Sequence, residues 1–113
     1  MASRYQMTNK DLKKLFLHLN ERFYQNRIPK SYHLRFDDLE EGTQGECSVE
    51  DEEILIDNRF RKDIDFVTII LHHEMTHADN PEYIGNIDDE THGTMFQGGI
   101  ARLIRMGAYD GLL

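Results

Sequence analysis

Five consecutive residues in the middle of the chain, His73-Glu74-Met75-Thr76-His77, have the types and the spacing of a metal site. Side chains four residues apart lie one above the other on a helix face, so two imidazoles at this spacing can both reach a zinc ion at about 2.0–2.1 Å. Glu74 projects beside the metal, where it can take a proton from an activated water and pass it to a leaving amine. The H-E-x-x-H pattern therefore predicts metal-assisted hydrolysis of peptide bonds.

The surroundings of this motif matter, because a five-residue pattern can arise by chance in a chain that holds six histidines. We expect a helix over residues 63–79, since Asp63 can cap its N-terminus and Asn80-Pro81 ends it. Apolar residues cover most of its circumference ahead of the motif: Ile64, Phe66, Val67, Ile69, Ile70 and Leu71. Two histidines and a glutamate in such a buried helix are costly unless a partner compensates their polarity, which favours a metal site.

A catalytic zinc needs a third protein ligand and one position open to water, and His92 is the candidate that we favour. The segment 78–91 between His77 and His92 is long enough for a loop to turn back and start another helix. Gly93 has no side chain, which lets the backbone approach the metal site. The alternative third ligands are Asp88-Asp89-Glu90, since zinc also accepts carboxylates, and one of these acids could instead orient a ligating imidazole.

Further elements must hold this motif in place. Thr8 is a candidate N-cap for a first helix, with Asp11 three residues later, and Ile28-Pro29 ends that helix or lies just beyond it. Its apolar stripe has helical spacing and consists of Leu12, Leu15, Phe16, Leu19 and Phe23. A small sheet follows, with strands expected at residues 32–36, 45–50 and 53–57. A last helix is expected over 91–106, with Gly107 at its end.

The other histidines and two tyrosines receive lesser roles. His72 points about 100° away from its neighbour in the motif, so we expect it to be packed or solvated and not a ligand. His18 and His33 fall on the polar sides of their elements and are expected in solvent. Tyr83 and Tyr109 are candidates to donate a hydrogen bond to the oxyanion formed in hydrolysis, with packing as the simpler role for each.

Two motifs together resemble the signature of the SprT-like zinc metallopeptidase domain. That signature is HExxH followed by HGxxF, and the chain has His73-Glu74-Met75-Thr76-His77 and then His92-Gly93-Thr94-Met95-Phe96. The likeness extends upstream to Leu15-Phe16, Asn20, Phe23, Ile28-Pro29, Gly45, Cys47, Ile54–Asn58 and Phe60. It covers about residues 8–107, nearly the whole chain.

The resemblance implies a single domain over residues 1–113 with an α+β fold and a minimal zincin-like core. That core has an N-terminal helix, a small antiparallel sheet, the metal-binding helix and a C-terminal helix. The resemblance also implies Zn²⁺ as cofactor, held by His73, His77 and His92, with Glu74 as the catalytic base and a protein or peptide as substrate. Relatives that cut proteins trapped on DNA carry a zinc ribbon or a basic DNA-binding region. The chain has no cysteine cluster and no basic tail after Met106, so we expect any contact with nucleic acid to be weak or indirect.

The composition is that of a globular domain and excludes several classes. Thirteen basic and 21 acidic residues give a net charge of -8, whereas phosphate binding relies on clustered Lys and Arg. No apolar run approaches the roughly 20 residues of a membrane helix, and the first ten residues are polar. The single cysteine, Cys47, cannot form an internal disulfide and is expected to be a small core residue. We therefore expect an intracellular protein, either cytoplasmic or, if associated with DNA, in the nucleoid or nucleus.

Two other functions remain compatible with the sequence. One is a non-catalytic binding module that zinc stabilises, although a closed structural site has no use for a base such as Glu74. The other is an acidic protein that mimics DNA, which the net charge alone supports and which predicts no bound metal. The sequence leaves the oligomeric state open.

Overall fold

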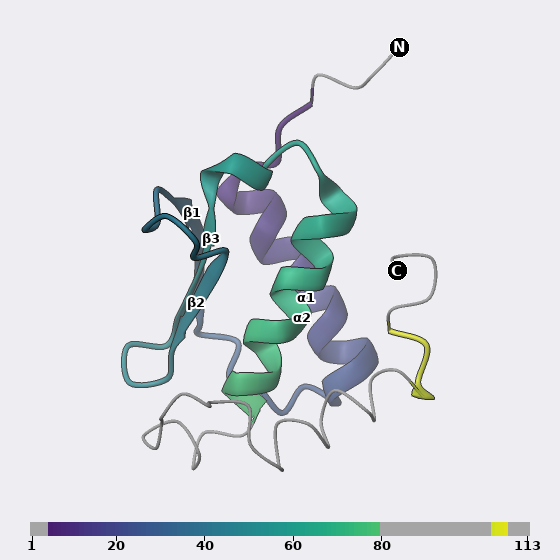
Figure 1. The fold of residues 1–113 in the computed structure, drawn as a ribbon. Coiled ribbons are helices and arrows are strands. Elements are labelled where there is room, and N and C mark those ends of the chain that lie inside the picture. The colour runs from purple at the N-terminus through teal and green to yellow at the C-terminus, as the bar shows by residue number, and fades with distance from the viewer. Residues whose placement is uncertain (1–4, 80–104, 109–113) are drawn as a thin grey trace.

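Two helices lie against one face of a three-stranded sheet (Figure 1). The computed structural model describes residues 5–79 and 105–108. In chain order the elements are α1 (Asn9–Tyr24), β1 (His33–Asp37), β2 (Gly45–Ser48), β3 (Glu53–Asp57), the 3₁₀ helix η1 (Asn58–Phe60) and α2 (Ile64–Asp79). Helix α1 packs on β1, while α2 packs on β2 and β3. The arrangement confirms the expected α+β fold with an N-terminal helix.

Helix α1 begins where its capping residues predict. The Thr8 hydroxyl accepts a hydrogen bond from the Asp11 backbone N–H at 3.1 Å, and the Asp11 carboxylate accepts one from the Thr8 backbone N–H at 2.9 Å. This reciprocal pair satisfies two backbone donors that the first turn would otherwise leave exposed. The helix ends at Tyr24, and its C-cap Gln25 adopts a left-handed conformation with a φ of 51°, so Ile28-Pro29 lies just beyond the helix, one of the two expected positions.

The sheet has the strand order β1-β3-β2 and is mixed. Strands β2 and β3 form an antiparallel hairpin in which Cys47 pairs with Ile54. Strands β1 and β3 run parallel, and Leu34 pairs with Ile54 from the other side. The expectation of an antiparallel sheet was therefore wrong for the β1–β3 pair. The physical reason is that the hairpin turns β3 back into the space between β1 and β2, so β1 and β3 point in the same direction.

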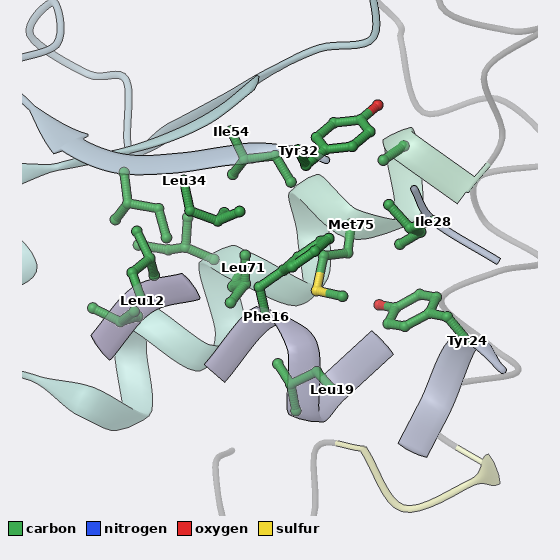
Figure 2. Close-up of a cluster of buried hydrophobic side chains, with 14 of the residues drawn as sticks. Leu12, Phe16, Leu19, Tyr24, Ile28, Tyr32, Leu34, Ile54, Leu71 and Met75 are labelled. Carbon is green, nitrogen blue, oxygen red and sulfur yellow. The ribbon is translucent and has the colours of Figure 1, made fainter. Parts of the chain in front are cut away.

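The hydrophobic core lies between the sheet and the two helices (Figure 2). Apolar side chains from α1, α2 and the inner faces of β1 and β3 meet there, and alternate residues of β1 point into the core as the period-two pattern predicts. The largest of these buried side chains are Leu12, Phe16, Tyr24, Ile28, Tyr32, Ile54, Ile56, Val67, Leu71 and Met75. The core therefore fixes α2 relative to the sheet.

Helix α2 matches the expected range and is capped by Asp63, whose carboxylate accepts a hydrogen bond from the Phe66 backbone N–H at 3.0 Å. Its first residue, Ile64, is exposed, so the helix is buried over less of its circumference than expected. Of the expected helix at 91–106, the described part holds Arg105, which is helical, and Met106, and the rest lies outside the described residues. Gly107 has a φ of 83°, as expected for a residue that ends a helix. Within the described ranges, no helix has the length and apolar character to cross a membrane.

Candidate active site

His73 and His77 lie one turn apart on the same face of α2. Their ring centres are 5.3 Å apart with an angle of 71° between the ring planes, and both side chains are half-buried. Two imidazoles that share one zinc at about 2.0–2.1 Å place their ring centres on the order of 5 Å apart. The spacing of the two rings therefore fits a shared metal ion.

Glu74 lies between these histidines in the chain and is buried, with 6% of its surface exposed. Burial raises the pKa of its carboxyl group to about 8, and the nearby Glu46 carboxylate adds to this effect. Across residues 5–79 and 105–108, no lysine or arginine forms an ion pair with it. A buried carboxylate without a cation is costly, so a divalent ion at the neighbouring imidazoles would stabilise its charged form.

A cleft of about 350 Å³ opens beside these residues. One wall is the face of α2 that carries Ile69, His73 and Glu74, and the other is the segment Gly42–Gly45, which leads into β2. Helix α2 packs directly on this strand. Two groups of the predicted motif therefore border a space that a substrate could enter, with strand β2 alongside.

The segment that forms the second wall of the cleft is held by hydrogen bonds from the end of β3 and from η1. The Arg59 guanidinium donates a hydrogen bond to the carbonyl oxygen of Thr43 at 3.2 Å. The backbone N–H of Asp57 donates one to the carbonyl oxygen of Gln44 at 2.9 Å. The Asp57 carboxylate accepts hydrogen bonds from the backbone N–H groups of Arg59 and Leu39 at 2.9 and 3.2 Å, which lower the pKa of Asp57. These contacts fix the shape of the cleft.

His72 points away from the cleft into the core, as expected for a residue that is not a ligand. It is completely buried, and its Nδ1 lies 3.0 Å from the hydroxyl of Tyr24. Burial lowers the pKa of its imidazole to about 4, so the ring is neutral at physiological pH. The Thr76 hydroxyl donates to the carbonyl oxygen of His72 at 2.8 Å. The pair Tyr24–His72 thus ties the middle of α2 to α1.

The end of α2 just beyond His77 is tied to the chain that follows α1. Arg27 forms a bidentate ion pair with Asp79, with N–O distances of 2.9 and 2.7 Å. The planar guanidinium fixes the direction of the carboxylate as well as its distance. Both ends of the motif are therefore held against α1 or the segment after it.

The structure describes three of the four predicted site residues: the rings of His73 and His77 lie side by side, and Glu74 lines the same cleft as His73. His92, the alternative acids of 88–90, Tyr83 and Tyr109 lie outside the described residues. The described ranges hold no group of three or more His, Cys, Asp or Glu side chains placed to bind one metal ion. They hold two imidazoles at a spacing that fits a shared ion, and all three ligands of the predicted site stay predictions.

Other sequence expectations are confirmed. His18 and His33 are exposed, and Cys47 packs against the hydrophobic core, where burial raises the pKa of its thiol to about 12. No pattern in the sequence indicates that Thr43 and Gln44 line the cleft or that Arg59 holds Thr43. The glycines at 42 and 45 were the only local signal, and they do not specify which helix lies opposite.

Comparison with known proteins gives one match. The model of the SprT-like family matches residues 12–109, which include both histidines of the motif, Glu74 and His92. No curated protein is significantly similar to the chain. The match covers most of the chain and both halves of the HExxH…HGxxF pattern.

Proposed function

Because the chain belongs to the SprT-like family, whose members are generally zinc metallopeptidases, we propose that it is a zinc-dependent endopeptidase. The observation that carries the proposal is that His73 and the buried Glu74 line one cleft, while the ring of His77 lies 5.3 Å from that of His73. A purely structural zinc site is closed by four protein ligands and has no use for a buried carboxyl group at its side. The arrangement favours a catalytic site.

The metal would be held by His73 and His77 from α2 and by His92, with an acid of 88–90 as the alternative third ligand. Zn²⁺ bound there would polarise the scissile carbonyl group and make a water molecule a better nucleophile at neutral pH. The ring spacing of 5.3 Å supports this ligand pair. The packing of α2 on the sheet and on α1 keeps both rings on a rigid element.

Glu74 would act as the general base and then as the general acid. Its carboxylate takes a proton from the attacking water and passes it to the leaving amine, which completes peptide hydrolysis without a covalent intermediate. Its burial and its place in the cleft wall support this role, because proton transfer needs a carboxyl group that is close to the reacting atoms and shielded from bulk water.

The substrate would be a protein or peptide in an extended conformation. Within the described ranges, β2 pairs with β3 along one edge and has no strand partner along the other, and its start borders the cleft. An unpaired edge of this kind can accept a peptide as an additional strand. Proteins associated with or crosslinked to DNA are the substrate class that we would test first, and the net charge of -8 makes direct attraction to the DNA itself weak.

The test is cleavage of unfolded and DNA-bound protein substrates by the wild type and by Glu74→Gln, with zinc content measured on both. We expect Glu74→Gln to retain zinc and lose about 10²- to 10⁴-fold in turnover, the usual contribution of a general base. Glu50→Gln, which changes an exposed acid in the β2–β3 turn, is the matched control and should cleave like the wild type.

Each other outcome of this test contradicts the proposal in its own way. Equal activity of Glu74→Gln and the wild type would remove Glu74 from the mechanism. A wild type that holds zinc but cleaves no substrate would instead fit a zinc-stabilised binding module, and a wild type without zinc would fit an acidic DNA mimic.

A further inference from the structure

Strand β2 packs on α2 and begins with Gly45, which lines the cleft. A Cβ atom placed on Gly45 would lie 2.7 Å from Cγ2 of Ile70, 3.1 Å from Oε2 of Glu74 and 3.2 Å from the carbonyl oxygen of Leu55. A Cβ contact of 2.7 Å essentially never occurs in a folded protein, so a side chain here requires its neighbours to move.

The reason for a glycine at this position is space and not backbone conformation. The described glycines with positive φ are Gly42 and Gly107, and Gly45 has an ordinary strand conformation in register with Ile56. Gly42, on the same wall of the cleft, is the opposite case: its φ is 91°, and a Cβ there would meet nothing within 4 Å. Gly45 is therefore required because there is no room for a side chain, whereas Gly42 is required because its backbone conformation favours glycine.

Of the three atoms around Gly45, only one belongs to a group with a proposed chemical role. The Leu55 carbonyl belongs to the central strand β3 and is held by the sheet, and the Ile70 methyl packs in the core. The Glu74 carboxyl group can respond by rotating about its side-chain torsions. A methyl group at position 45 would therefore displace the Glu74 carboxylate from the place that it occupies beside the histidines.

We propose that Gly45 is a positioning residue for Glu74, leaving the space in which the carboxyl group is held against β2. The inference rests on the proposed role of Glu74 as general base. It assigns to Gly45 no contact with substrate or metal, and it predicts that turnover depends on the size of the side chain at this position.

The test compares Gly45→Ala with Glu50→Ala in the full chain. We expect Gly45→Ala to bind zinc and to lose about 10- to 100-fold in kcat with little change in KM, because a small displacement of a catalytic group is enough for such a loss. Glu50→Ala changes an exposed residue of the β2–β3 turn outside the cleft and should keep kcat close to that of the wild type. Wild-type kcat in Gly45→Ala would overturn the proposal.

A double variant separates positioning from packing. Ile70→Leu removes the Cγ2 methyl that the new Cβ meets first and keeps the number of side-chain carbons. In Gly45→Ala/Ile70→Leu we expect the unfolding temperature to recover and kcat to stay low, because the contact with Glu74 remains. Recovery of both properties would mean that Gly45 serves packing alone and would overturn the proposal. If Gly45→Ala alone does not fold, the double variant takes its place in the kinetic comparison.

Crystal structures of the zinc-free wild type and of the Gly45→Ala or double variant provide a readout that does not depend on activity. We expect the Glu74 carboxylate to occupy a different position in the variant, and an unchanged position would overturn the proposal. If the wild type cleaves no peptide, the proposed function fails, and these structures still decide whether Gly45 positions Glu74.

Discussion

The hydroxyl group of Tyr24 and Nδ1 of His72 lie 3.0 Å apart in the core, where α1 meets the helix that carries the proposed metal ligands. Both side chains are completely buried, so neither can exchange this partner for water. The contact lies one residue before His73 and faces away from the cleft. It therefore stabilises the helix without taking part in the chemistry.

Removal of this hydroxyl group should cost stability and leave zinc in place. We expect Tyr24→Phe to lower the free energy of unfolding by about 1–2 kcal/mol, because a buried hydrogen-bonding group loses its partner. Urea unfolding measures this change. Tyr5→Phe is the control, since the Tyr5 hydroxyl donates its hydrogen bond to Asp11 at an exposed site where water can replace it, and its loss should change stability by less than about 0.5 kcal/mol. Equal effects of the two substitutions would contradict the role of the Tyr24–His72 pair.

The Asp57 carboxylate should make the stability of the protein depend on pH. Hydrogen bonds from the backbone N–H groups of Arg59 and Leu39 lower its pKa below the ordinary value of 3.8. A lowered folded-state pKa adds stability that is present above the unfolded-state pKa and is lost as the pH falls through the folded-state pKa. Asp57 should therefore stabilise the fold at neutral pH and stop doing so under acid conditions.

Asp57→Asn should accordingly lower the free energy of unfolding by about 1 kcal/mol at neutral pH, because hydrogen bonds to a charged acceptor become bonds to a neutral one. The difference from the wild type should shrink as the pH falls through the lowered pKa of the native Asp57 carboxyl group, which then also becomes neutral. Urea unfolding at several pH values measures it, with the exposed Glu41→Gln as control. A difference that does not change with pH would contradict the assignment.

Zinc binding should distinguish the histidines of α2. We expect His73→Ala and His77→Ala each to lower the zinc content of the purified protein from about one ion per chain to near zero, because a site that loses one of three ligands binds its metal far more weakly. His72→Phe, which keeps a ring in the core, should retain zinc although it loses the contact with Tyr24. A loss of zinc from His72→Phe in a folded protein would contradict the ligand assignment.

The third ligand requires its own measurement. We expect His92→Ala to release the metal as His73→Ala does. Unchanged zinc content in His92→Ala would exclude His92 and direct the search to single alanine substitutions of Asp88, Asp89 and Glu90.

Local signals in the sequence were enough to predict helices α1 and α2. Thr8 and Asp11 form the capping box that their spacing indicates, and α2 follows its cap Asp63 and carries the motif on a helix as its period requires. The sequence also predicted that His72 and His73 point in different directions, since neighbours on a helix diverge by about 100°.

The order and direction of the strands could not be predicted in the same way. Alternation of buried and exposed residues in β1 is the same for a parallel and an antiparallel partner, so the expected antiparallel sheet rested on family resemblance and was wrong for β1. The proximity of Gly45 and Glu74 was also beyond local signals, because it depends on how closely β2 and α2 pack.

The central claim is that His73 and His77 bind one zinc ion beside Glu74. A crystal structure of the zinc-loaded protein, with anomalous data collected at the zinc absorption edge, tests it most directly. We predict one strong anomalous peak at about 2.0–2.1 Å from a ring nitrogen of each histidine, next to the cleft. A zinc-loaded crystal with no peak between these two rings, or with its zinc at another place, would contradict the account.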